Sequence, residues 1–154
     1  MARPKVEVRS AARFDPGFPD DRIETDAYFL EFPGRNICEA IADKFRQMQV
    51  RVDCLRNAGE HGWELDLSVG DRAFWLQISW IDEDCCILQF EEAPVLFRRK
   101  RFDDPVYWRF LRALHDALAK DGRFRNLRWF VRGDEDVVDG VGKPTPLDDS
   151  VPAL

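Results

Sequence analysis

Two histidines, His61 and His115, are the side chains of this sequence that would most readily activate a serine or cysteine nucleophile. His61 lies in a glycine-flanked loop, and His115 borders the apolar side of a helical segment. No Gly-x-Ser-x-Gly sequence occurs, and the adjacent Cys85 and Cys86 match no protease pattern. The sequence therefore predicts no catalytic residue and favours a non-enzymatic protein, with the enzyme class left open.

Four cysteines, Cys38, Cys54, Cys85 and Cys86, could ligate a metal or form disulfides. A zinc site would combine Cys54 and His61 with one of the adjacent pair, but the spacing lacks the close cysteine pair typical of zinc sites. The N-terminal residues carry no apolar signal-peptide segment, so we expect a cytoplasmic protein with reduced thiols. We predict no metal and no cofactor, and we expect the three cysteines in strand patterns to be buried as small hydrophobes.

A run of four bases between two phenylalanines is the strongest candidate for anion binding. Basic residues interleaved with aromatic rings suit single-stranded nucleic acid, because the rings stack on nucleobases while the cationic side chains contact phosphates. We favour instead a solvated sheet edge, where charged side chains prevent pairing with another sheet. The four bases are Arg98, Arg99, Lys100 and Arg101, and the arginines that could extend the patch are Arg123, Arg125, Arg128 and Arg132.

The composition is that of a chain able to fold around its own core. Of its 154 residues, 45% are hydrophobic and 34% are charged, which suits one domain. No apolar run reaches the ~18 residues that a membrane-spanning helix needs, so we expect no membrane contact. The formal net charge of −6 makes nucleic acid an unfavourable partner, although most of this charge lies after residue 132.

Apolar periodicity predicts an antiparallel sheet. Residues 63–69 and 72–81 alternate apolar and polar side chains, and Gly70–Asp71 between them predicts a hairpin. Further strands are predicted at residues 28–32, 50–54, 85–91 and 126–132, with a short additional edge strand at residues 95–98 as an option.

Two amphipathic helices flank this meander of strands. Asn36 and Glu39 resemble a capping box before the first helix, and Asp104–Pro105 opens the second. The order β-α-β-β-β-β-α-β predicts a single α+β domain, with an antiparallel sheet of five to six strands and both helices on one face. We place an irregular N-terminal arm at residues 1–25, the domain at 26–132 and an acidic mobile tail at 133–154.

A tryptophan, Trp75, is predicted on the sheet face opposite the helices. Because successive side chains of a strand point to opposite faces, Glu64 and Asp66 are predicted on that face too. Pairing through the predicted hairpin brings Trp75 and Gln77 beside them. An aromatic anchor with an acidic rim suits a basic protein partner. We therefore predict that Glu64, Asp66, Trp75 and Gln77 bind such a partner, unless the N-terminal arm or the tail covers them.

The size, the single-domain α+β layout, the acidity and the lack of catalytic motifs are together similar to those of small bacterial immunity proteins. These proteins bind and neutralise a toxin, so the likeness implies a bacterial protein-binding module. The likeness lies in the layout and includes no motif, so it assigns no residue a role. The alternatives are a small-molecule binder or enzyme with a pocket between helices and sheet, and a nucleic-acid accessory protein that uses the basic run 98–101. The oligomeric state stays open.

Overall fold

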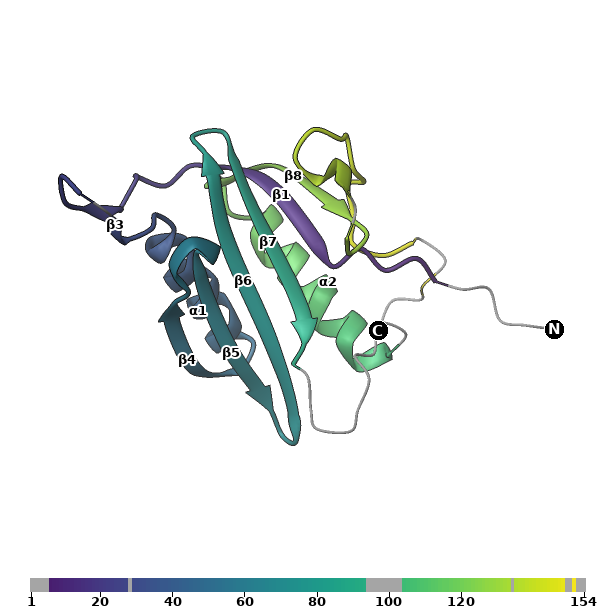
Figure 1. Ribbon diagram of the computed structural model, residues 1–154. Coiled ribbons are helices and arrows are strands. Elements are labelled where there is room, and N and C mark those ends of the chain that lie inside the picture. The colour runs from purple at the N-terminus through teal and green to yellow at the C-terminus, as the bar shows by residue number, and fades with distance from the viewer. Residues whose placement is uncertain (1–5, 28, 94–103, 134, 149–150, 152–154) are drawn as a thin grey trace.

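The architecture of the protein is that of a six-stranded antiparallel sheet with two helices against one face (Figure 1). The computed structural model describes residues 6–27, 29–93, 104–133, 135–148 and 151. In spatial order the strands are β4 (Arg51–Asn57), β5 (Trp63–Val69), β6 (Arg72–Asp82), β7 (Cys85–Glu92), β1 (Ala11–Pro16) and β8 (Phe124–Phe130). The predicted α+β class is confirmed.

Both helices lie behind the sheet in Figure 1. Helix α1 (Arg35–Gln47) packs on β4 and β5, and helix α2 (Pro105–Ala119) packs on β7 and β8. The remaining elements are the two-stranded sheet of β2 (Ile23–Glu24) and β3 (Phe29–Glu31) and the 3-10 turns η1 (Gly59–His61) and η2 (Glu135–Val137). Within the described ranges, no helix is long and apolar enough to cross a membrane.

The core lies between the helices and the inward face of the sheet. Leu67 of β5 and Ile78 of β6 project inward, where they share one cluster with Ile41 of α1 and Leu114 of α2. These four side chains are at most 1% exposed. The period-two pattern of residues 63–69 and 72–81 therefore identifies the inward face correctly, because a slip of one residue would have turned every one of these side chains outward.

The N-terminal arm is more regular than the sequence predicts, because it contains the inner strand β1. Ala11 pairs with Gln89 of β7 on one side and with Phe130 of β8 on the other. The predicted strand at residues 28–32 is instead represented by β3, which pairs with β2 outside the main sheet. The strand β1 escapes pattern recognition because Ala11 and Ala12, on opposite faces, are both buried.

The expected mobile tail also packs on the domain in its described part. The Trp129 N–H donates to the Lys143 carbonyl at 2.7 Å, and the Lys143 N–H donates back at 2.9 Å. Leu147 and Val151 are 3% and 4% exposed and belong to the core cluster. Two widely spaced apolar side chains show no periodicity, yet main-chain hydrogen bonds hold them in place, so these described residues pack against the residues that precede position 133.

The two helices begin differently. Helix α2 starts as predicted, since the Asp104 carboxylate accepts the Val106 N–H at 2.9 Å. Helix α1 has Gly34 as its N-cap, and the expected side-chain cap at Asn36 is wrong. The Asp21 carboxylate instead accepts the N–H groups of Gly34 and Asn36, at 2.8 and 2.7 Å. The first turn of α1 is therefore satisfied by a distant residue of the N-terminal arm.

Candidate functional site

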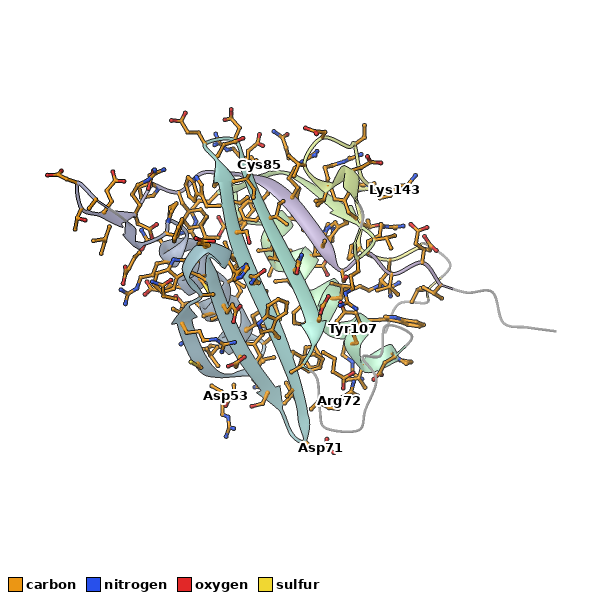
Figure 2. The ribbon with its side chains drawn as sticks, viewed as in Figure 1. Asp53, Asp71, Arg72, Cys85, Tyr107 and Lys143 are labelled. Carbon is orange, nitrogen blue, oxygen red and sulfur yellow. The ribbon has the colours of Figure 1, made fainter. Side chains whose placement is uncertain are left out.

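The outward face of strands β5, β6 and β7 is open in the part of the chain that the structure describes, and no described segment crosses it in Figure 1. Figure 2 marks its two ends, with Asp71 at the tip of the β5–β6 hairpin and Cys85 at the opposite end. We call this surface the open face. The strand register assigns it the side chains of Glu64, Asp66, Trp75, Gln77, Ser79, Ile87, Gln89 and Glu91.

The four residues predicted to bind a partner lie together on the open face. Asp66 is directly opposite Trp75 across the β5–β6 pair, and Glu64 is directly opposite Gln77. The Gln77 side-chain amide donates to Glu64 Oε1 at 3.0 Å. Trp75 itself is half-buried. The N-terminal arm does not cover this patch with its described residues, because its strand β1 lies within the plane of the sheet.

An arginine that the sequence analysis missed changes the charge of this patch. Arg56 of β4 contacts Glu64 Oε2 at 2.5 Å through Nη2 and Asp66 Oδ2 through Nη1. Burial disfavours its charge, but the hydrogen bonds to Asp66 and Glu64 outweigh that effect and raise the pKa of Arg56 above its ordinary value. One cation thus offsets part of the charge of two carboxylates, and the predicted acidic rim is only weakly acidic.

The far side of the open face is also charged and internally paired. Glu91 of β7 has a side chain only 4% exposed, and its Oε1 lies 3.0 Å from Arg132 Nε. Between this pair and the Arg56 cluster, the strands present side chains without charge. These uncharged side chains are Trp75, Gln77, Ser79, Ile87 and Gln89. The open face therefore has an uncharged centre that contains one large aromatic ring, and a rim of paired charges.

The alternative anion-binding patch stays a prediction, because its central residues are not among those that the structure describes. The basic run Arg98–Arg101 lies outside the described residues. Of the four arginines that could have extended it, Arg123 pairs with Asp121, Arg132 pairs with Glu91, and Arg125 and Arg128 donate to backbone carbonyls. Each of these guanidinium groups is thus engaged within the chain.

The two histidines lie in different environments. His61 belongs to the exposed turn η1, whereas His115 of α2 is half-buried. The indole Nε1–H of Trp129 donates to His115 Nδ1 at 3.0 Å, so the imidazole must be neutral to accept it. Burial lowers the pKa of His115, and the nearby Asp116 only partly opposes this shift. This geometry gives His115 a structural hydrogen bond with a core tryptophan.

The four cysteines are free thiols, and the burial expected of the three in strand patterns is confirmed for Cys85 and Cys86 and wrong for Cys54. Cys38, Cys85 and Cys86 are buried, and desolvation raises the pKa of Cys38 to about 12. Cys54 is exposed, because a bulge after Val52 turns it to the outward side, opposite Asp66. In the described ranges no three His, Cys, Asp or Glu side chains are grouped so that they could hold a metal ion.

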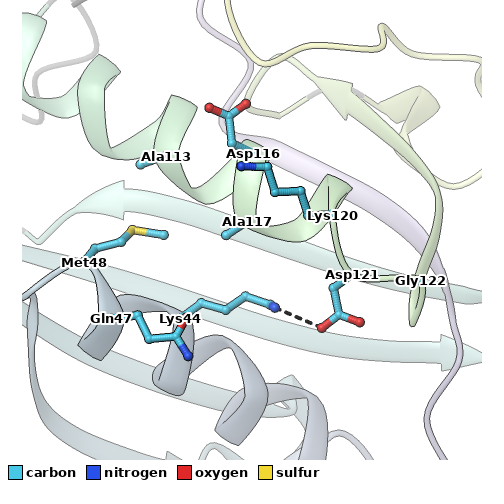
Figure 3. A pocket seen from close by; sticks show the side chains of 9 residues that line it. All are labelled: Lys44, Gln47, Met48, Ala113, Asp116, Ala117, Lys120, Asp121 and Gly122. Carbon is cyan, nitrogen blue, oxygen red and sulfur yellow. Dashed lines mark hydrogen bonds and ion pairs between the residues drawn. The ribbon is translucent and has the colours of Figure 1, made fainter.

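A hollow lies between the two helices, on a different side of the molecule (Figure 3). Its volume is about 680 Å³. Lys44 of α1 reaches across it to Asp121, at 2.9 Å, and Arg123 contacts the same carboxylate at 2.7 Å. These hydrogen bonds, with Arg123 first, lower the pKa of Asp121. The hollow combines small apolar side chains with paired charges and is not the apolar pocket under the sheet that a small-molecule binder would need.

No known protein family, no curated protein and no solved structure matches this chain. The likeness to immunity proteins therefore remains one of size and layout.

Proposed function

We propose that this protein is a non-enzymatic protein-binding module that contacts its partner through the open face. The observation that carries the proposal is the distribution of side chains on that face. Interfaces between proteins are depleted of charge and enriched in aromatic residues at their centre, and they have a polar rim. The open face has this arrangement, with Trp75 in the uncharged centre and the pairs formed by Arg56 and Arg132 at the rim.

Trp75 is the anchor of the proposed interface. It stands between Asp66 of β5 and Glu91 of β7 in the register, and it is half-buried. A large ring that is partly solvent-exposed gains most when a partner pocket removes it from water, which is why tryptophan dominates many interfaces. Gln77 and Gln89 lie opposite each other on β6 and β7 and add hydrogen-bonding groups that need no counter-charge.

A basic protein remains the partner that we propose, for a reason other than the predicted acidic rim. Arg56 already occupies Glu64 and Asp66, so a basic partner would gain little from contacting them directly. The formal charge of −6 would still speed the approach of a basic protein through long-range attraction. A toxin neutralised by an immunity protein is one such partner, and the size and layout of the chain support that version of the proposal.

The test places a photoreactive amino acid on each side of the molecule. Gln89 is exposed on the open face, and Gln47 is exposed at the end of α1, so the two positions are matched in residue type. We expect cross-linking to one protein of the source cell from position 89 and not from position 47. Trp75→Ala should then weaken binding of the purified partner by about 2 kcal/mol, roughly 30-fold, with little change in the melting temperature. Cross-linking from position 47 alone, or unchanged affinity of Trp75→Ala, would refute the proposal.

A further inference from the structure

The described C-terminal residues, 135–148 and 151, wrap around the outer edge of strand β8, and we call them the C-terminal strap. The strap begins beside β1 on the outward side, where Val138 O accepts a hydrogen bond from Arg13. It ends on the helix side, where Val151 O accepts from Arg112 of α2 at 2.6 Å. Lys143, labelled in Figure 2, lies where the strap runs along β8.

The strap is bound partly as an added strand. Trp129 and Lys143 exchange two main-chain hydrogen bonds, and the Arg9 N–H donates to Pro146 O at 2.8 Å. Gly142 sits so close to β8 that a Cβ atom there would lie 2.7 Å from the Phe130 ring. This is the geometry by which a sheet edge accepts an extended peptide, with main-chain hydrogen bonds that do not depend on the peptide sequence.

Three arginines of the domain add further contacts to the backbone of the strap. Arg13 donates to Val138 O at 2.8 Å, Arg128 donates to Val141 O at 2.9 Å, and Arg9 donates to Thr145 O at 2.8 Å. Every residue of an extended peptide offers such a carbonyl oxygen. We call the path of the strap, between the β8 edge and the side chains of Arg9, Arg13 and Arg128, the groove along β8. Most of its contacts are with the peptide backbone.

Three strap side chains supply the sequence-specific contacts. Leu147 and Val151 are buried in the core cluster, at 3% and 4% exposure. Between them, the Asp148 carboxylate accepts from Arg9 Nη1 at 3.2 Å and from the Glu7 N–H at 3.0 Å. The Arg9 side chain is only 6% exposed and also contacts Glu7 Oε1 at 2.6 Å, so an occupant that lacked the Asp148 carboxylate would remove one of its two carboxylate partners and leave the Glu7 N–H without its acceptor.

We propose that the groove along β8 is a docking site for an extended acidic peptide of a partner protein, and that the C-terminal strap occupies it in cis. Most strap residues between 136 and 145 are exposed or half-buried, as is the connection Val131–Gly133, so local release requires less than global unfolding. A tethered segment acts at a high effective concentration. The strap therefore hinders the partner peptide until it is displaced. This second surface is independent of the open face.

The first test measures binding of a fluorescent synthetic peptide, residues 143–154 of this chain, to the full-length protein by anisotropy. The protein with Leu147→Ser and Val151→Ser has a weakened strap, and we expect it to bind the peptide at least tenfold more tightly than the wild type. A control peptide that carries Asp148→Lys should bind at least tenfold more weakly, because it places a cation against buried Arg9. Equal binding of both peptides, or no binding to the variant while it remains folded, would overturn the proposal.

A second test does not depend on the folding of that variant. A protease site inserted after Gly133 in the full-length protein allows the strap to be cut while it stays bound. Native mass spectrometry should then show the labelled peptide replacing the strap, and the Asp148→Lys peptide failing to do so. Permanent retention of the cut strap under excess peptide would make it a fixed part of the fold. A dimer that exchanges straps without binding peptide would identify a second copy as the occupant and would also refute the proposal.

Discussion

The two edges of the main sheet are protected in different ways. Strand β4 forms one edge, with no described strand on its outer side, and Asp53 lies there in Figure 2. The bulge after Val52 and the exposed Arg51–Asp53 pair, with Arg51 Nε 2.5 Å from Asp53 Oδ1, discourage further pairing. Strand β8 forms the other edge, and the C-terminal strap covers it near Lys143.

One sheet edge is therefore protected by residues of its own strand, and the other by a segment farther along the chain. The β4 edge carries its own bulge and charges, so it needs no other part of the chain. The β8 edge contains Trp129, whose main-chain N–H and C=O groups pair with those of Lys143, a residue farther along the sequence. A covered edge is also an edge that can be uncovered, and only the β8 side can therefore serve as a conditional binding site.

Removing the strap should have the largest effect. A chain that ends at Gly133 loses two buried apolar side chains, each contributing about 1.5–3 kcal/mol, and it leaves buried Arg9 without Asp148. We expect the melting temperature to fall by more than ~10 °C. Val151→Ala should reproduce part of the fall, whereas Val141→Ala, at a position 76% exposed, should have no effect. An unchanged melting temperature of the shortened chain would show that β8 needs no cover.

Replacing Asp121, which links helix α1 to the turn before β8, should have the next largest effect on stability. Asp121 connects α1, which supports β4, to the turn before β8, and Asp121→Asn should cost about 1.5–3 kcal/mol in urea unfolding at neutral pH. Its folded pKa is lowered below the ordinary 3.8, so its ionised form stabilises the fold above about pH 4 and loses this effect as the pH falls. The wild type and Asp121→Asn should therefore converge in strong acid.

A surface pair provides the control for Asp121. Asp43, 69% exposed, contacts Arg46 at 2.7 Å, and Asp43→Asn should change stability by less than about 1 kcal/mol. If Asp43→Asn and Asp121→Asn were equally mild, the bridge between the helices would not couple the two sides of the sheet.

Mild acidification, between pH 7.5 and 5.5, should act on the β8 side through His115. The pKa of His115 is lowered in the fold, so neutral His115 stabilises the protein above its ordinary pKa near 6.5, and that contribution is lost as the pH falls. Protonation also removes the acceptor of the Trp129 indole. We expect the melting temperature to fall less between pH 7.5 and 5.5 in His115→Gln than in the wild type. His61→Gln, in the exposed turn, should keep the wild-type pH dependence.

Removing charge from the β4 edge should change stability least. Replacing Arg51 and Asp53 together with threonine removes a pair that is 77% and 32% exposed, so the melting temperature should move by less than ~2 °C. Light scattering should nevertheless show larger species than in the wild type, because the edge has lost its repelling charges. The same double replacement at Asp43 and Arg46, on the surface of α1, should leave the particle size unchanged.

The sequence predicts those parts of the fold that are organised locally. Residues 63–69 and 72–81 are recognisable because alternation and a two-residue turn are both read within a short window. The adjacency of Glu64 with Gln77 and of Asp66 with Trp75 follows from that hairpin alone. The charge of the patch does not, since the approach of Arg56 depends on the bulge in β4, which shifts the face of every residue after it.

The parts that were missed depend on partners far away in the chain. Strand β1 contains Ala11 and Ala12, which alternate in direction but not in polarity, so no period marks them. Leu147 and Val151 are too few to form an amphipathic pattern, and their burial requires the groove beside β8. Asp21 caps α1 from outside the helix, where a capping signal within the helix sequence cannot reveal it.

The position of β1 in the sheet also determines when this strand can pair during synthesis. Of the six strands of the sheet, β1 leaves the ribosome first, whereas its neighbour β7 leaves fifth and its neighbour β8 leaves last. The meander of β4 to β7 can close early, since its pairings are sequential, whereas β1 must wait as an unpaired strand. During that interval both of its edges are open to wrong partners, so the slow, vulnerable step of biosynthesis is the insertion of the first strand between its two late neighbours.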